Sequence, residues 1–379
     1  MRTLVTGGAG FLGSHLCDAL IDRGDHVVCL DDLSSGRVAN VSHLLDCERF
    51  TFVEADARWE ITLEGKFDAV AHLASPASPP DYLERPPESL TAGSHATLSA
   101  LNFAHANNAR FMLASTSEVY GDPLVHLQPE TYWGNVNPIG PRSVYDEAKR
   151  FAEAMTTSYG AARGVNVGII RIFNTYGPRM RADDGRVITN FIVQALRGAP
   201  LTLYGNGQQT RSFCYVADLI RGIVGMLDCS EPGPINLGNP EELSMKELAE
   251  LVIHITGSTS EITHCPLPAD DPTRRKPVIE QAAQRLGWAP SVPIEIGIKQ
   301  TIEWFQHPAE MNAAPTGNRD GRESGRRHRG ALVQEPHVPG FGQLYAPWRS
   351  GTISAHWGRA NTDRRRFPRG GGDTAAGAA

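Results

Sequence analysis

A tyrosine and a lysine stand four positions apart in the sequence, in the stretch Tyr145-Asp146-Glu147-Ala148-Lys149. Residues at this spacing share one face of a helix, so the phenol and the ammonium group point the same way. A nearby cation stabilises phenolate and lowers the tyrosine pKa, which turns a poor base into a usable one near neutral pH. The pair therefore predicts a general base.

Hydroxyl and carboxyl groups precede this pair by about 30 residues, in Ser115-Thr116-Ser117-Glu118-Val119-Tyr120-Gly121. The stretch ends an apolar, strand-like run, so we expect its polar side chains at the rim where the sheet meets its ligand. The candidate catalytic residues from these two motifs are Thr116, Ser117, Glu118, Tyr145 and Lys149.

A glycine-rich turn lies near the start of the sequence, in Thr6-Gly7-Gly8-Ala9-Gly10-Phe11-Leu12-Gly13. It follows a short apolar run and precedes a helical pattern. Glycines at 7, 10 and 13 permit a tight turn, a close approach of backbone to a pyrophosphate, and close packing of helix on strand. The phosphates would lie at the helix N-terminus, where free N–H groups and the helix dipole favour an anion.

Acidic residues follow the next two strand-like runs. Asp31 would accept hydrogen bonds from the adenosine ribose hydroxyls and repel a 2′-phosphate, which favours NAD over NADP. Asp56 would accept from the adenine amino group; a loop cap for Asp31 and an ordinary loop carboxylate for Asp56 are the alternatives. The predicted cofactor contacts are Gly7, Gly10, Phe11, Leu12, Gly13, Asp31, Asp32, Ser34, Ser35, Gly36, Asp56, Ala57, Leu73, Tyr145 and Lys149.

Short apolar runs alternate with helical patterns over residues 1–172. Strands are expected at 3–6, 26–30, 50–54, 69–73, 111–115 and 165–172, and helices at 11–23, 88–107 and 145–163. Buried strands that alternate with helices imply a parallel sheet covered on both faces. The predicted fold is α/β, a doubly wound Rossmann-type sheet that binds NAD at the carboxyl ends of its strands.

The pattern changes twice further along the chain. Residues 173–306 combine loops rich in Gly, Pro and Asn with helices near 190–197, 218–227 and 244–255, which predicts a smaller substrate-binding unit. Residues 307–379 are rich in Gly, Pro, Ala and Arg, contain no lysine, and show no sustained period. Such a segment buries too little apolar surface to offset its ordering entropy, so we expect a disordered tail.

Composition narrows the possible partners and the compartment. A net charge of −6 gives no electrostatic reason to bind nucleic acid or an anionic membrane. No apolar run reaches the ~18 residues of a membrane span, and no signal peptide is expected. The six cysteines show no metal-ligand or disulfide spacing, so we expect buried free thiols, no metal, and a cytoplasmic protein.

These residues together resemble the extended short-chain dehydrogenase/reductase family, of the NAD-dependent epimerase/dehydratase type. Within it the sequence is most similar to the branch that converts UDP-glucuronate to UDP-xylose. The resemblance covers residue 1 to about residue 305, and the matching segments are residues 74–80, 115–122, 132–140, 171–180, 209–213 and 270–276. The resemblance implies oxidation of the sugar at C4 and loss of CO2 from the resulting β-keto acid. Protonation at C5 and reduction of the ketone by the same NAD would follow.

The resemblance also implies roles for single residues. Tyr145 would remove the C4 hydroxyl proton with Thr116 bound to that hydroxyl, and Lys149 would tune the base and hold the nicotinamide ribose. Ser117 and Glu118 would face the C5 carboxylate, with Arg275 as the cationic partner near the reacting sugar. The residues matched to nucleotide and diphosphate contacts are Asn174, Arg186, Asn190, Tyr204 and Arg211. The family's matching helices imply a homodimer.

Two departures from the family pattern bear on the substrate. Thr91-Ala92-Gly93 stands where the family usually has Lys-Thr-Asn, and that lysine is expected near the substrate carboxylate. A water on Thr91 or another cation could replace it. Val278 stands where the family has an aspartate, at a position that we take to be peripheral. Neither departure touches the Tyr145 and Lys149 pair.

Other functions fit parts of the sequence. A nucleotide-sugar 4,6-dehydratase would share the fold, NAD and the first oxidation, but many such enzymes have an aspartate acid where this chain has Ser117. A uronate 4-epimerase would keep the carboxylate, and a non-catalytic NAD-binding regulator would usually have lost Tyr145 or Lys149. The arginine runs of the tail could contact nucleic acid or a membrane, although short basic clusters are usually solvated. The residues do not distinguish uracil from thymine in the substrate.

Overall fold

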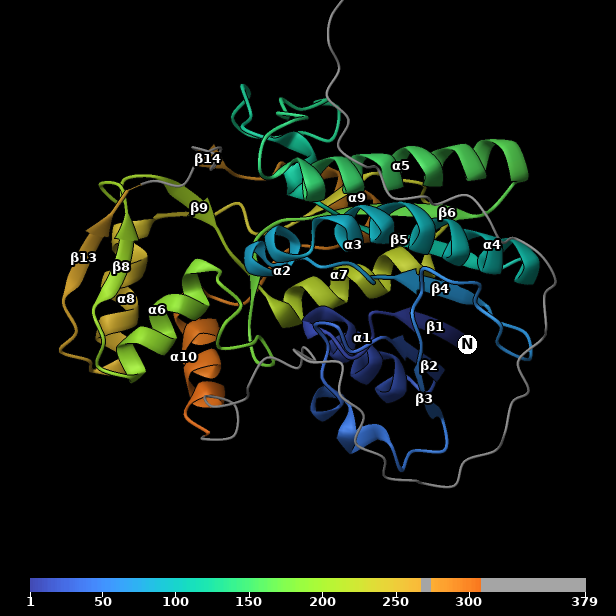
Figure 1. The fold of residues 1–379 in the computed structure, drawn as a ribbon, viewed down its shortest axis with the longest axis horizontal. Helices are drawn as coiled ribbons and strands as arrows, with labels where there is room; N and C mark the ends of the chain where they lie inside the picture. Colours follow the sequence, from blue (N-terminus) through green and yellow to red (C-terminus); the bar gives the residue numbers. More distant parts are fainter. Residues whose placement is uncertain (267–273, 308–379) are drawn as a thin grey trace, which may run out of the picture. The chain divides into compact units, whose positions relative to one another are not determined.

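A parallel sheet of seven strands forms the centre of the computed structural model, which describes residues 1–266 and 274–307 (Figure 1). Its strands pair in the order β11-β6-β5-β4-β1-β2-β3, and every neighbouring pair is parallel. The central strands β4 and β5 are buried along their whole length, as expected where helices cover both faces. The strands span β1 Arg2–Thr6, β2 His26–Asp31, β3 Phe50–Glu54, β4 Ala69–His72, β5 Arg110–Thr116, β6 Val167–Ile172 and β11 Ile235–Leu237.

The strand order reverses between β1 and β4, and this reversal sets the position of the ligand site. From β1 the chain adds β2 and β3 on one side, then returns to place β4 on the other side of β1. Such a switch point leaves a crevice at the carboxyl ends of the two strands. The predicted doubly wound fold is confirmed.

Helices cover both faces of the sheet (Figure 1). Helices α1 and α7 pack against each other on one face, and α4 and α5 pack together on the other. Their bounds, with those of the short helices beside them, are α1 Phe11–Asp22, η1 Val38–Asn40, η2 Ser42–Leu44, α2 Pro79–Glu84, α3 Pro86–Thr91, η3 Ala92–Ala96, α4 Thr97–Asn107, η4 Ser117–Tyr120, α5 Ser143–Arg163 and α7 Val216–Asp228. No helix within the described ranges is both long and apolar enough to cross a bilayer.

One predicted helix is interrupted. The sequence pattern suggested a single helix over residues 88–107, whereas α3 and α4 are separated by the π-helical turn η3. Gly93 in this turn lies so close to α5 that a Cβ atom there would be 2.6 Å from both Cβ and O of Ala148. The wider turn accompanies this close contact, and such turns are frequent near functional sites.

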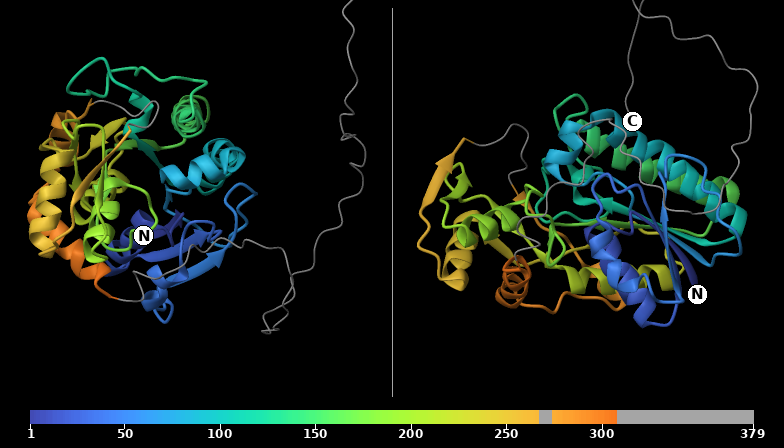
Figure 2. Two further views of the ribbon diagram at one scale, coloured as in Figure 1. Left: turned by 60° about the vertical axis from the view of Figure 1, so that its left-hand side comes forward. Right: turned by 60° about the horizontal axis from the view of Figure 1, so that its bottom comes forward.

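Most of the remaining elements pack at one end of the sheet (Figure 2), whereas α9 contacts β11 and α7 at the edge of the sheet. The remaining elements are β7 Thr175–Tyr176, α6 Val187–Leu196, β8 Leu201–Tyr204, β9 Thr210–Ser212, β10 Cys214–Tyr215, β12 Glu242–Ser244, α8 Met245–Thr256, β13 Ile262–Cys265, β14 Arg274–Arg275, α9 Glu280–Leu286 and α10 Ile294–Phe305. One apolar cluster extends from Val5 in β1 to Phe305 in α10. The sheet and this core therefore draw on residues from both sides of the predicted boundary at residue 172. The predicted tail lies outside the described residues except for residue 307.

Candidate active site

A cavity of about 910 Å³ lies at the carboxyl ends of the central strands and reaches into the group of elements beyond them. Its size falls in the range of small-molecule sites. All the predicted site residues line it except Gly36, which packs directly against the Asp31 carboxylate that does line it. The structure thus brings together residues that span the chain from Gly7 to Arg275.

The glycine-rich turn is so tightly packed that Gly7 and Gly13 have no room for a side chain. Gly7 has a φ of +72°, and a Cβ atom on Gly13 would lie 2.1 Å from the carbonyl oxygen of Gly7. Helix α1 begins at the next residue after Gly10, and no described side chain caps its N-terminus. Free amide groups and the helix dipole at this end suit a pyrophosphate, so the turn fits the predicted dinucleotide.

Asp31 supports this turn as well as facing the cavity. Its Oδ2 accepts the Ala9 N–H at 2.9 Å and its Oδ1 accepts the Leu33 N–H at 2.8 Å. Burial raises the pKa of the Asp31 carboxyl to about 6. Each carboxylate oxygen has a second lone pair, so Asp31 can still accept from a ribose hydroxyl. Asp32 beside it accepts the Ser34 N–H at 2.9 Å.

Asp56 has a protein partner that the sequence did not indicate. The Arg58 side chain contacts both carboxylate oxygens, with Nη2 2.7 Å from Oδ2. Burial acts to raise the pKa of Asp56, but the hydrogen bonds from Arg58 outweigh it and lower that pKa. Arg58 also reaches the Thr91 hydroxyl at 3.4 Å, and Thr91 does not line the cavity. The residue expected near the substrate carboxylate therefore lies beside the Asp56–Arg58 pair instead.

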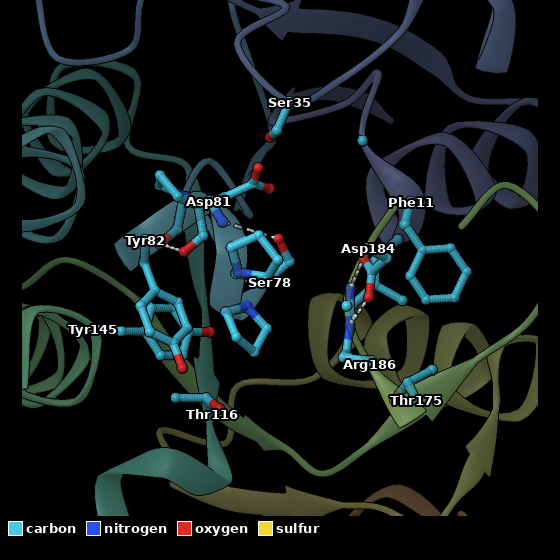
Figure 3. Close-up of a pocket in the computed structure, with 18 of the residues that line it drawn as sticks. Phe11, Ser35, Ser78, Asp81, Tyr82, Thr116, Tyr145, Thr175, Asp184 and Arg186 are labelled. Atoms are coloured by element: carbon cyan, nitrogen blue, oxygen red, sulfur yellow. Dashed lines mark hydrogen bonds and ion pairs between the residues drawn. The ribbon is translucent and has the colours of Figure 1, made fainter. Parts of the chain in front are cut away.

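Tyr145 is buried and its ring stacks on Tyr82, with ring centroids 5.0 Å apart and an interplanar angle of 6° (Figure 3). Burial raises the pKa of the Tyr145 phenol, the Glu118 charge acts the same way, and a hydrogen bond with Thr116 acts against them. The sequence had suggested a lowered pKa from Lys149. That expectation is wrong for the protein alone, because desolvation of the phenol outweighs the effect of the cation.

Lys149 lies near Tyr145, and its ammonium group is hydrogen-bonded to the backbone of β5. Its Nζ donates to the Ala114 carbonyl at 2.8 Å and is 5.9 Å from the centre of the Tyr145 ring. Burial lowers the pKa of Lys149 to about 8. His72, in the strand beneath, bonds through its two ring nitrogens to Thr6 Oγ1 at 2.8 Å and Thr97 Oγ1 at 3.2 Å. His72 is thus a hydrogen-bonded core residue.

Glu118 is held between two arginines. Its Oε2 lies 2.7 Å from Arg142 Nη2 and 2.8 Å from Arg275 Nη2, and its Oε1 contacts Arg275 Nη1. Burial acts to raise the pKa of Glu118, but the charges of Arg275 and Arg142 lower it to about 2. Glu118 is therefore an ionised carboxylate at neutral pH and has no proton to give.

A buried glutamine holds the segment that carries Arg275. Gln128 is fully buried; its Oε1 accepts the Lys276 N–H at 2.7 Å, and its backbone N–H donates to the Lys276 carbonyl at 2.9 Å. The Gln128 carbonyl accepts the Val278 N–H at 3.0 Å, and Asn236 Nδ2 donates to both carbonyls, of Gln128 and Val278. These bonds fix the chain directly after Arg275.

The predicted nucleotide and diphosphate contacts line the other side of the cavity. Arg186 makes a bidentate ion pair with Asp184 and lies over the Phe11 ring at 5.9 Å, across from Tyr145 in Figure 3. Arg211 is buried on β9, next to Arg275 on β14. The other predicted contacts that line the cavity are Asn174, Asn190 and Tyr204.

Several residues around the site were not predicted from the sequence, among them Arg142, Tyr82 and Gln128. Arg142 stands three residues before Tyr145, and an arginine at the start of the catalytic helix was the available signal. Tyr82 and Gln128 carry no comparable signal, because their roles depend on contacts made only in the fold.

Comparison with known proteins agrees with the geometry of the site. The family model for the NAD dependent epimerase/dehydratase family matches residues 3–238. UDP-glucuronic acid decarboxylase 1 of Xenopus tropicalis is 49% identical over 312 residues, which are 82% of this chain and 74% of that protein.

Two solved structures share the fold. UDP-glucose 4-epimerase of Thermotoga maritima, solved with UDP-glucose, matches with a TM-score of 0.75 and 29% identity over 81% of this chain and 99% of that one. UDP-glucuronic acid 4-epimerase of Bacillus cereus, in complex with UDP-glucuronic acid and NAD, matches with a TM-score of 0.71 and 28% identity over 81% of this chain and 99% of that one. The chain belongs to the NAD dependent epimerase/dehydratase family.

Proposed function

We propose that this chain is an NAD-dependent UDP-glucuronate decarboxylase that forms UDP-xylose. The observation that carries the proposal is the grouping of Tyr145, Thr116, Glu118 and Arg275 in one cavity with the glycine-rich turn. The likeness to a UDP-glucuronic acid decarboxylase, at 49% identity, supports it. The epimerases that share the fold are less similar in sequence, at 28–29% identity.

Tyr145, Thr116 and Lys149 have separate roles at the reacting carbon. Held by the glycine-rich turn and Asp31, NAD would supply the hydride acceptor and donor for C4 of the sugar, and its oxidised nicotinamide would carry a positive charge. Tyr145 takes the proton of the C4 hydroxyl, and Thr116 orients the phenol through their hydrogen bond. Lys149 adds positive charge behind the phenol, 5.9 Å from the ring centre. Added positive charge is what a phenol with a raised pKa needs to act as a base.

The other cavity residues hold the substrate. Arg186 and Arg211 suit the diphosphate, because a guanidinium fork meets phosphate oxygens bidentately. Arg275 lies on the Tyr145 side and suits the sugar carboxylate. The stacked Tyr82 ring keeps water from one face of Tyr145. The reacting groups are thereby held together in a site with little water.

The test is a reaction of purified protein with UDP-glucuronate and NAD, followed by CO2 release and by mass of the nucleotide sugars. We expect UDP-xylose, and we expect Tyr145→Phe to lower kcat by about 10²–10⁴-fold, as for loss of a positioned proton-transfer group. Tyr159→Phe on the same helix, outside the cavity, is the matched control and should keep full activity. UDP-galacturonate as the product would mean a uronate 4-epimerase, and no turnover with NAD bound would reject the proposal.

We also propose that the enzyme is a homodimer that pairs through the helical stretch of α3, η3 and α4 and through α5. In support, the Phe151 side chain on α5 is 51% exposed and Leu90 on the neighbouring α3 is 46% exposed. Large apolar side chains on adjoining helices suit a protein interface. Sedimentation equilibrium of the full chain would test this proposal, and a monomer at micromolar concentration would reject it.

A cytoplasmic location completes the proposal. The six cysteines are all free thiols, which is the usual state in a reducing compartment. Fractionation of the source cells, with detection of this chain, would test the location.

A further inference from the structure

Two segments that are far apart in the sequence meet at the wall of the cavity. One includes helix α2, and the other is residues 178–186, which lead into α6. Asp81 on α2 pairs with Arg181, whose Nη2 lies 2.9 Å from the aspartate Oδ1. A Cβ atom on Gly185 would lie 2.7 Å from Cγ of Pro80. The two segments are therefore in direct contact, and these four residues line the cavity.

Residues 178–186 are fixed to α1, the helix whose N-terminus fits the pyrophosphate of the dinucleotide. His15 Nε2 lies 3.0 Å from the Pro178 carbonyl oxygen. Arg179 Nη2 lies 2.7 Å from Asp18 Oδ2. Because His15 and Asp18 both belong to α1, these two contacts hold the segment beside that helix.

Helix α2 is fixed to the loop that follows β2. Arg85, the residue after α2, donates to the Ser34 carbonyl oxygen at 3.2 Å, and its Nη2 lies 3.5 Å from Asp81 Oδ1. Ser34 stands three residues after Asp31, which fits the adenosine ribose. The contact of Asp81 with residues 178–186 therefore completes a series of contacts from the ribose end of the cavity to α1.

The pair of Asp81 and Arg181 is largely removed from water. The two side chains are 15% and 14% exposed. Burial acts to lower the pKa of Arg181, but the hydrogen bond to Asp81 outweighs it and raises that pKa. An ion pair with little access to water is screened less than an exposed pair. Arg181 also contacts Asp183 at 3.1 Å within its own segment, so Asp81 supplies the contact that joins the two segments.

We propose that Asp81 and Arg181 form a latch that controls how fast NAD enters and leaves the cavity. The glycine-rich turn and Asp31 fit the dinucleotide, and both segments that the latch joins line the same cavity. A dinucleotide held there leaves when α2 and residues 178–186 move apart, which breaks the latch. Slow release keeps the cofactor in place during turnover, whichever nucleotide sugar reacts.

The test follows the release of NADH from the full-length protein. Protein loaded with NADH is mixed with a large excess of NAD, and the loss of fluorescence from bound NADH gives the release rate. Loss of a hydrogen bond between charged groups shifts an equilibrium by about 10- to 100-fold, so Arg181→Gln should speed release by about this factor. Because the latch joins protein to protein, NADH should also bind faster, and its Kd should change less than about threefold.

Further variants test whether the pair itself is responsible. Asp81→Asn should speed release as Arg181→Gln does. The double variant should release NADH no faster than the faster single variant, because both changes break one contact. Arg285→Gln is the control, since it breaks an ion pair with Glu231 at 2.8 Å outside the cavity, and its release rate should equal that of the wild type.

The outcomes separate the latch from other roles. A wild-type release rate in both Arg181→Gln and Asp81→Asn would overturn the proposal. Faster release with an unchanged binding rate would also overturn it, because it would show that these residues contact the cofactor directly. Should Arg181→Gln not fold, Arg181→Lys keeps the charge without the planar fork, and faster release and binding in this variant would support the latch. None of these rates depends on CO2 release, so the latch is tested apart from the proposed function.

Discussion

Replacing Gln128 with alanine should impair catalysis through Arg275 without touching the cavity. The Gln128 backbone bonds to Lys276 and Val278 would remain, since alanine keeps the same main chain. Two side-chain bonds would be lost, one from the Lys276 N–H at 2.7 Å and one to the Val125 carbonyl at 2.7 Å. The change therefore loosens the segment next to Arg275.

The size of the effect follows from the groups left unpaired. A buried donor or acceptor without a partner costs about 1–3 kcal/mol, and two such groups should lower the free energy of unfolding by about 2–4 kcal/mol once water reaches them. Loosening of Lys276 displaces Arg275 from Glu118. A displacement of about 1 Å in a positioned group can cost about 10²-fold, so kcat should fall by about 10- to 100-fold. The Kd of NAD should not change, because Gln128 does not line the cavity.

Urea unfolding and steady-state kinetics on the same preparations would measure both effects. Asn107→Ala is a matched control, because Asn107 also accepts a backbone N–H, from Phe67 at 3.1 Å, and donates to a carbonyl, of Phe103 at 3.0 Å. It lies on α4 away from the cavity, so its loss should reduce stability while kcat stays at the wild-type value. Wild-type kcat in Gln128→Ala, with stability reduced as in the control, would refute the role given to Gln128.

Two further predictions concern stability. Gly93→Ala should destabilise the protein by about 1–3 kcal/mol, because the new Cβ would lie 2.6 Å from Ala148. Gly225→Ala in α7 should stabilise it by about 0.5–1 kcal/mol, because the nearest atom to the new Cβ is 3.8 Å away. Thermal unfolding that gives the same sign for both variants would contradict this prediction. Burial and then the Lys149 charge lower the pKa of His72 to about 3. Below pH 6.5 the unfolded chain therefore binds more protons than the folded protein, and the free energy of unfolding decreases as the pH is lowered. From pH 7.5 to 5 this should cost about 2 kcal/mol in urea unfolding, and a His72→Gln variant with an unchanged pH slope would show that His72 is not responsible.

The sequence predicted those features that depend on residues close together in the chain. The strand that ends at Thr6, the glycine turn after it and the helix from Phe11 follow from one short stretch, and the structure reproduces them. The same holds for Tyr145 and Lys149, whose spacing on α5 sets their common face. Local rules of backbone geometry and amphipathic period are enough for such features.

Features that depend on distant contacts were beyond this reasoning. The π-helical turn at Gly93 depends on Ala148 in another helix, and apolar spacing alone does not distinguish it from a continuous helix. The pairing of Glu118 with Arg275 joins residues 157 positions apart. The raised pKa of Tyr145 likewise follows from burial, which no local pattern gives.

The charges around Thr116 also bear on which reaction this cavity can perform. A 4,6-dehydratase must give a proton to a leaving hydroxyl, and the residues after Thr116 supply no acid for that step. Ser117 has an alcohol, and the pKa of Glu118 is held at about 2 by its two arginines. Loss of CO2 itself needs no acid, and the enolate that it leaves must then take up a proton at C5 from a group other than Glu118. An ionised Glu118 after Thr116 therefore disfavours a 4,6-dehydratase, and turnover of UDP-glucose to a 4-keto-6-deoxy sugar would contradict this reading of the site.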